Sequence, residues 1–217
     1  MDALEAFTLG VAVGMFFFND EPVGTSEQQH VVAPSRPLNP RHIIPRMVVL
    51  DFDYTLLNGK LSDITPSSLS VRERSRLFYD ADFLLNFCEK CISAHHVLRI
   101  ASHAESSAGS SDVGEEMCLL LNSVLPLRRG YLNDPAHIAC WRSSSGKNSH
   151  VDQLLECTHR SGEGSFSFYQ VVLIDDCESN IRKASQVGYH GFHCDTGFSR
   201  QWFSGQIALH HLLGFSL

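Results

Sequence analysis

Asp51 directly follows the apolar residues 47–50, and a single residue separates it from Asp53. In an extended chain, side chains two positions apart point the same way, so these two carboxylates face a common space. Such a pair can share a divalent metal ion, or divide the roles of nucleophile and proton donor. Taken alone the pattern is also typical of loop and capping aspartates.

A second acidic pair, Asp175 and Asp176, follows the apolar residues 171–174. Two adjacent carboxylates at the edge of a core repel each other unless a cation neutralises them. This pair therefore predicts a divalent metal site. Capping of the following helix by Asp176 is compatible with that role.

A hydroxyl and an amine complete the candidate chemistry. Ser102 and His103 follow residues 97–101, and Lys147 comes after the small residues 143–146 at the start of a predicted helix. A lysine in a first helical turn opposes the helix dipole unless it faces an anion, which favours anion binding by Lys147. Helix N-capping is the alternative role for Ser102.

The elements that must position these residues alternate between strands and helices. Short runs rich in β-branched residues predict strands at residues 47–50, 97–101, 137–141, 171–174 and 190–194. Helical spacing of apolar residues predicts helices at residues 78–93, 113–124, 147–157, 178–187 and 201–213. This alternation predicts an α/β fold, a three-layer α/β/α sandwich with a central parallel sheet. Ligands bind such sheets at the carboxyl ends of the strands, and all four features lie at the carboxyl end of a strand or at the start of a helix.

The composition of the chain bears on its ability to fold, its partners and its location. The chain has 217 residues, 43% of them hydrophobic and 19% charged, so it can build a sizeable core. Its 17 basic and 24 acidic residues give a net charge of −7, which argues against nucleic acid as a partner. Seven cysteines, an odd number, and the lack of an Asn-x-Ser/Thr acceptor favour a reducing, cytoplasmic location.

The first 45 residues differ from the rest. An apolar run at residues 9–18 is too short to span a bilayer as a helix, and the acidic start is unlike a secretory signal. We expect this run to pack on the domain, with membrane anchoring as the alternative. Five of the eight prolines then fall between residues 22 and 45, which indicates an extended linker. The predicted division is residues 1–45 as an extension and 46–217 as the folded domain.

The order Asp51-x-Asp53-x-Thr55, then Ser102, then Lys147, then Asp175-Asp176 resembles the haloacid dehalogenase (HAD) superfamily of aspartate-based phosphohydrolases. Together with Asn180, these residues are similar to the small magnesium-dependent phosphatases of that superfamily, an acid phosphatase family described as acting on protein tyrosine phosphate or sugar phosphates. The resemblance covers residues 46–196.

The resemblance implies a strand order of 3-2-1-4-5, a Mg²⁺ cofactor and hydrolysis of phosphomonoesters. It implies that Asp51 is the nucleophile, forming an aspartyl-phosphate, and that Asp53 is the general acid and base. Mg²⁺ is then held by the Asp51 carboxylate, the Asp53 backbone carbonyl and Asp175, with Asp176 and Asn180 in support.

The phosphate of the substrate is expected to bind Ser102, His103 and Lys147, and Thr55 to fix the turn that aims Asp53. The intervals between motifs are too short for a large cap domain, so the site is expected to be open to small-molecule or phosphoprotein substrates. Two departures from the family concern substrate preference: Leu57 and Asn58 replace an aromatic residue, and His103 replaces a more basic one.

Other functions remain as alternatives. A receiver domain combines similar residues, but its acidic pair comes first and its lysine last. A metal or redox module could use Cys88 and Cys91 with His95 and His96, although this Cys-x-x-Cys lies in a helix and reads as two core cysteines. A scaffold that kept the fold and lost the activity is the third alternative.

Overall fold

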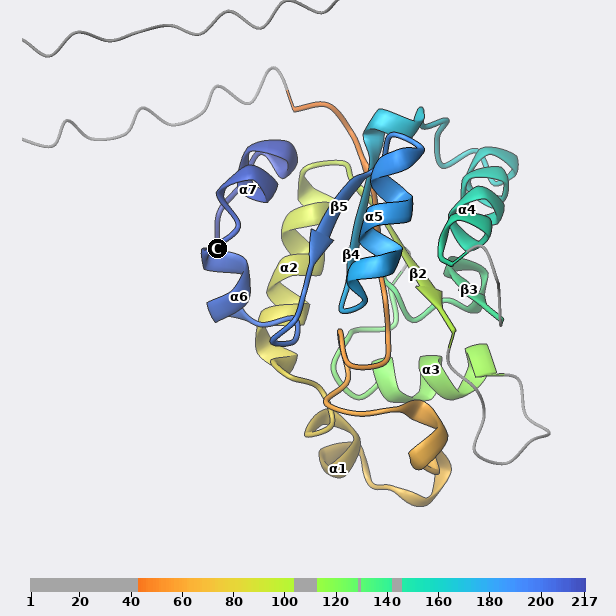
Figure 1. Cartoon of the computed structure of the whole chain (residues 1–217). Helices are drawn as coiled ribbons and strands as arrows, with labels where there is room; N and C mark the ends of the chain where they lie inside the picture. Colours follow the sequence, from red (N-terminus) through yellow and green to blue (C-terminus); the bar gives the residue numbers. More distant parts are fainter. Residues whose placement is uncertain (1–42, 104–112, 129, 142–145) are drawn as a thin grey trace, which may run out of the picture. The chain divides into compact units, whose positions relative to one another are not determined.

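A computed structural model of the chain describes residues 43–103, 113–128, 130–141 and 146–217. Its centre is a sheet of five parallel strands in the order β3-β2-β1-β4-β5 (Figure 1). The strands are β1 (Met47–Leu50), β2 (Val97–Ser102), β3 (Ile138–Cys140), β4 (Val171–Asp175) and β5 (His190–His193). The predicted α/β class and the 3-2-1-4-5 order are both confirmed. The predicted extension, except for residues 43–45, lies outside the described residues.

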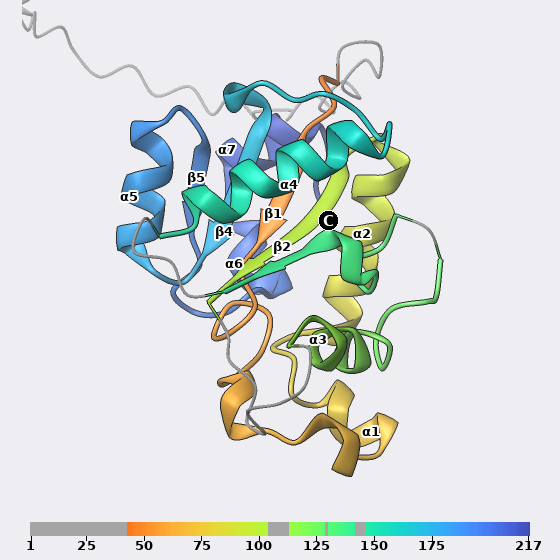
Figure 2. The ribbon, with the colours of Figure 1, turned by 90° about the vertical axis from the view of Figure 1, so that its right-hand side faces the viewer.

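Helices cover both faces of the sheet. They are α2 (Ala81–Ser93), α3 (Val113–Leu121), α4 (Asn148–Arg160), α5 (Glu178–Gln186), α6 (Arg200–Ser204) and α7 (Ile207–Leu213). Helix α4 crosses the near face of the sheet in Figure 2, and α2 lies on the opposite face. The result is the three-layer sandwich that the alternating pattern predicts.

Alternation along the strands creates two separate cores. Val48 and Leu50 of β1 face a cluster with α2, α3, α6 and α7, whereas Met47 and Val49 face a smaller cluster with α4 and α5. All four β1 side chains are fully buried, so this strand has no solvent face. A strand buried on both faces is apolar throughout, which is why residues 47–50 are readable as a strand from composition alone.

All five predicted helices occur, but their ends differ from the prediction by up to three residues, and one of them is divided in two. Helix α2 begins at Ala81 rather than residue 78, because Asp80 caps it by accepting a hydrogen bond from the Phe83 N–H at 2.9 Å. The helix predicted at residues 201–213 is two helices, α6 and α7. The N–H of Gly205 donates to the Trp202 carbonyl, and the chain turns before it becomes helical again at Ile207. Glycine is a poor helix former, and the break lets each short helix bury its own side chains in the core.

The segment between β1 and α2 forms three short helices: η2 (Leu61–Asp63), η3 (Pro66–Ser68) and α1 (Val71–Ser75). A capping box between Ser70 and Glu73 starts α1. Arg72 and Arg76 are exposed, while Arg74 donates to the Leu119 carbonyl of α3. In Figure 1 this segment lies at the end of the molecule toward which the strands run.

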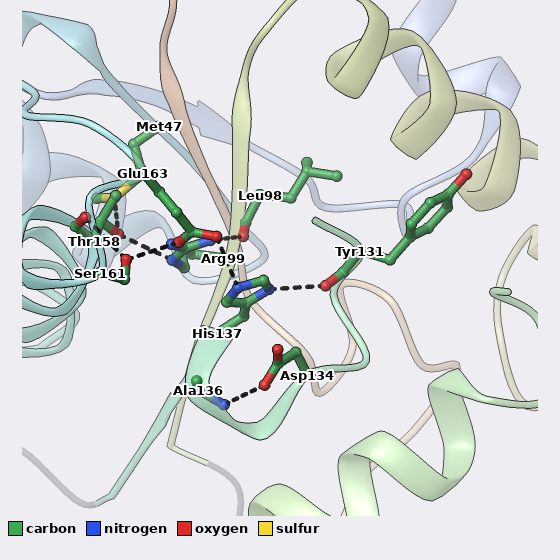
Figure 3. A network of polar contacts seen from close by, with 10 residues as sticks. All are labelled: Met47, Leu98, Arg99, Tyr131, Asp134, Ala136, His137, Thr158, Ser161 and Glu163. Atoms are coloured by element: carbon green, nitrogen blue, oxygen red, sulfur yellow. Dashed lines mark hydrogen bonds and ion pairs between the residues drawn. The ribbon is translucent and has the colours of Figure 1, made fainter. Parts of the chain in front are cut away.

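A buried polar network stands apart from the carboxyl ends of the strands (Figure 3). Arg99 of β2 has a side chain only 2% exposed, and it forms an ion pair with Glu163. It also donates to Thr158 of α4 and to the Leu98 carbonyl. On the other side of Glu163, His137 lies 3.6 Å away and donates from Nδ1 to the Tyr131 carbonyl. The network ties the loop after α4 to β2.

No described helix is long and apolar enough to cross a membrane. The apolar run at residues 9–18 lies outside the described part of the chain.

Candidate active site

Strand register brings the two acidic pairs together. Leu50 of β1 lies beside Ile174 of β4, and the Asp51 N–H donates to the Ile174 carbonyl at 2.9 Å. Because both strands end at the same level, Asp51 and Asp175 are neighbours across the sheet although they are far apart in sequence. Ile100 of β2 lies on the other side of Leu50, which places Ser102 just beyond the same edge.

Asp51, Asp175 and Asp176 form one acidic cluster. A ligand oxygen from each lies within 4.8 Å of the others. Asp175 is fully buried and Asp51 is 4% exposed. Burial, followed by the charge of Asp51, raises the pKa of Asp176 to about 6 and also raises the pKa of Asp175. Three hard oxygen donors whose negative charge is costly in this place are suited to Mg²⁺.

Asp175 is held by donors on the β4–α5 turn. Its Oδ1 accepts from the Cys177 N–H at 2.8 Å, and the Asn180 side-chain amide lies 3.1 Å from both carboxylate oxygens. Asn180 occupies the first turn of α5, so the start of that helix fixes the carboxylate. Asn180 therefore lies beside Asp175, and the supporting role that the resemblance implies for it at a metal site stays a prediction.

Thr55 connects the two acidic loops. Its fully buried hydroxyl donates to Asp51 Oδ2 at 3.3 Å and accepts from the Asp176 N–H at 3.0 Å. The sequence assigns Thr55 to the turn that aims Asp53. In the structure its side chain instead orients Asp51 and joins the β1 loop to the β4 loop.

Lys147 reaches the cluster from the start of α4. Its Nζ lies 2.5 Å from Asp51 Oδ1, and the residue is 2% exposed. The approach depends on Gly146, which has φ +72. A Cβ at Gly146 would lie 2.9 Å from the Asn180 side-chain oxygen, so only glycine fits there without a shift. The burial cost of the lysine cation is offset by the acidic groups that it faces.

Asp53 lines the same cavity as Asp51. Its Oδ1 accepts from the Leu61 N–H at 2.9 Å, and burial raises its pKa to about 6. A carboxyl group with this pKa exists in both protonation states near neutral pH, as a general acid and base requires. Asp53 is outside the cluster of side-chain oxygens formed by the other three aspartates.

One cavity of about 510 Å³ contains most of the predicted site. Its described lining includes Asp51, Asp53, Ser102, His103, Lys147, Asp176 and Asn180. Burial, and then the charge of Lys147, lowers the pKa of His103, so its imidazole is neutral near neutral pH. Asp175 and Thr55 are buried and are outside the described lining of this cavity.

Several lining residues were not predicted. They are Tyr54, Lys60, Ser62, Gly146, Cys177, Ser179 and Lys183. A signal was available for Lys183, which lies one helical turn beyond Asn180 and therefore on the same face of α5. No comparable local signal exists for Lys60 and Ser62, because the turn that brings them back to Asp53 depends on backbone bonds.

The Cys-x-x-Cys of α2 lies in the larger core. Cys88 and Cys91 are fully buried free thiols, and burial raises the pKa of both. His96 uses both ring nitrogens: Nδ1 accepts from the Arg46 N–H, and Nε2 donates to the Leu213 carbonyl. His95 is exposed at the end of α2. These contacts favour core packing for this cluster over a metal centre.

A scan against models of known protein families finds no match for this chain, and a search of curated proteins also finds none.

Proposed function

We propose that this protein is a Mg²⁺-dependent phosphomonoester hydrolase of the haloacid dehalogenase type, acting through an aspartyl-phosphate on Asp51. The observation that carries the proposal is the contact between Lys147 Nζ and Asp51 within a three-carboxylate cluster at the carboxyl edge of the sheet. Phosphoryl transfer needs a positioned nucleophile and positive charge around the phosphoryl oxygens. The described residues supply both in one cavity.

Asp51, Asp175 and the Asp53 backbone carbonyl are the expected holders of Mg²⁺, with Asp176 in support. When bound, the ion neutralises the carboxylates and the phosphoryl oxygens. Lys147 contributes a positive charge beside Asp51 Oδ1. Ser102 and His103 offer a hydroxyl and an imidazole to the remaining oxygens.

In the first step Asp51 attacks phosphorus, and an Asp51–phosphorus bond forms as the ester oxygen departs. Asp53 gives its proton to that oxygen, so the alcohol leaves neutral. Asp53, now a carboxylate, then takes a proton from a water molecule that attacks phosphorus. The Asp51–phosphorus bond breaks, and inorganic phosphate is released. Thr55 keeps Asp51 in line throughout by its hydrogen bond to Oδ2.

The deciding experiment measures p-nitrophenyl phosphate turnover with Mg²⁺ and with EDTA, for wild type and Asp51→Asn. We expect Mg²⁺-dependent turnover in wild type and at least a 10³-fold loss in the variant, since the nucleophile is removed. Asp82→Asn, an exposed aspartate on α2, is the matched control and keeps full activity. Undiminished turnover in Asp51→Asn would exclude it as the nucleophile, and an inactive wild type would favour a scaffold that lost the activity.

A further inference from the structure

We infer that the loop after Asp53 is a leaving-group subsite for an alcohol that carries a second anionic group. Lys60, Tyr54 and Ser62 form this subsite, and all three line the cavity that contains Asp51. The inference rests on the proposed function, because it names the class of phosphate ester that the hydrolase accepts.

Two hydrogen bonds fold the loop back on itself. The Tyr54 N–H donates to the Gly59 carbonyl at 3.0 Å, and the Leu61 N–H donates to Asp53 Oδ1 at 2.9 Å. Tyr54 has φ 56, a left-handed conformation that is strained for a bulky residue. Such strain persists where the surrounding structure enforces it, commonly at functional sites. Here it turns the chain so that residues 60–62 return to Asp53.

The position of the general acid decides which end of the substrate this loop faces. A general acid must lie within hydrogen-bonding distance of the oxygen that it protonates. Under the proposed mechanism Asp53 therefore contacts the ester oxygen, and the alcohol extends past the residues beside Asp53. Lys60 directly precedes Leu61, whose N–H donates to Asp53 Oδ1, and it lines the same cavity as Asp53. Lys60 thus lies close enough to meet the alcohol.

The chemistry of these side chains favours an anion over an alkyl or aryl group. The Lys60 ammonium lies 5.9 Å from the centre of the Tyr54 ring, so the ring helps to position this cation in the lining of the cavity. Ser62 adds a hydroxyl. Among the described lining residues, the only rings are those of Tyr54 and His103, and none has an aliphatic side chain such as Leu or Val. A carboxylate or a second phosphate on the alcohol meets the lysine, whereas a purely apolar group finds little to pack against.

A matched pair of substrates tests this inference. Glycerol 3-phosphate and 3-phosphoglycerate differ in one group, a hydroxymethyl in the first and a carboxylate in the second. We expect wild type to hydrolyse 3-phosphoglycerate with a kcat/KM roughly fivefold higher at low salt, the size expected for an exposed charge pair. The preference should decline as ionic strength rises, because Lys60 is exposed.

Variants at Lys60 identify the source of the preference. In Lys60→Met the ratio of the two kcat/KM values falls to about one, while Lys60→Arg retains a preference because the charge remains. Lys90→Met, which removes an exposed lysine from α2 outside the described lining of the cavity, is the control and leaves the ratio unchanged. An unchanged ratio in Lys60→Met overturns the inference.

The same assays separate this inference from the proposed function. If p-nitrophenyl phosphate is hydrolysed and the two glycerol-type substrates are hydrolysed equally, or not at all, the subsite is wrong and the hydrolase stands. If none of the three substrates is hydrolysed in the presence of Mg²⁺, the proposed function fails and the subsite falls with it.

Discussion

Thr55 shows how a single buried hydroxyl can join the two loops that carry the acidic cluster. It donates to Asp51 and accepts from the Asp176 N–H, so one side chain orients the proposed nucleophile and satisfies a backbone donor. We expect Thr55→Val to lower kcat for p-nitrophenyl phosphate roughly 10- to 100-fold, because misplacement of a reacting group is costly. Thr55→Ser keeps both bonds and most of the activity. Steady-state kinetics of both variants provide the test, and a wild-type kcat in Thr55→Val contradicts this positioning role.

His150 makes stability depend on pH. It is fully buried at the start of α4, donates from Nε2 to the Trp141 carbonyl at 2.8 Å, and stacks on the Trp141 ring. Burial lowers its pKa to about 4 from the ordinary 6.5. The folded protein therefore holds His150 neutral, whereas the unfolded chain takes up a proton below pH 6.5. Its contribution to stability is complete above that pH and is lost progressively as the pH falls from 6.5 towards 4.

Urea unfolding at pH 7.5 and 5.5, in wild type and His150→Gln, measures this effect. We expect wild type to lose about 1 kcal/mol more than the variant between these two pH values, close to the limit for one proton over one pH unit. His96 and the acidic cluster titrate in both proteins, so their contributions cancel in the comparison. Equal losses in the two proteins would show that His150 does not take up a proton on unfolding in this range.

At the scale of elements, the Arg99–Glu163 pair connects β2 to the loop after α4 (Figure 3). The Arg99 guanidinium is almost fully buried, so removal of its partner charge leaves a buried cation without compensation. We expect Glu163→Gln to lower the free energy of unfolding by about 3 kcal/mol. The matched control is Glu156→Gln, which breaks an exposed ion pair with Arg160 on α4 and costs less than about 0.5 kcal/mol. Chemical denaturation of both variants checks this, and similar small losses would contradict the role of the buried pair.

Elements were predictable from sequence where the signal is local. β1 and β4 are apolar on both faces, so their positions follow from composition. Helix α5 ends before Gly188, so its end follows from the position of that glycine. The strand order followed from the resemblance of the ordered motifs. The break between α6 and α7 was missed because the apolar spacing continues through Gly205.

Contacts between distant residues could not be predicted in the same way. Arg99 sits in a run that reads as a buried strand, and its partner Glu163 lies 64 residues further along the chain. The bonds of Thr55 likewise depend on how β1 and β4 pair. The candidate site was predictable in its acidic pairs and Lys147, whereas the return of Lys60 to Asp53 required the backbone geometry of the loop.

At the scale of the whole molecule, the acidic cluster that forms the proposed metal site lowers the stability of the metal-free protein. Burial and the charge of Asp51 raise the pKa of Asp176 to about 6, so its charged form is less favourable in the folded state than in the unfolded chain. Above that pKa the Asp176 carboxylate is charged and lowers the free energy of unfolding, so loss of its charge relieves the repulsion. We therefore expect Asp176→Asn to raise the stability of the metal-free protein at pH 8 by about 1 kcal/mol.

Mg²⁺ should reverse the order of the two proteins. An ion that binds the folded state alone stabilises it by about 1.4 kcal/mol at ten times its dissociation constant. Wild type should gain this stability in Mg²⁺ and lose it in EDTA, whereas Asp176→Asn gains less because one of the three clustered carboxylates has lost its charge. Thermal unfolding of both proteins in each condition, with Asp82→Asn as the control that behaves as wild type, provides the measurement. An equal Mg²⁺-dependent shift in wild type and Asp176→Asn would mean that the ion binds outside this cluster, because removal of a clustered charge must weaken any cation held there.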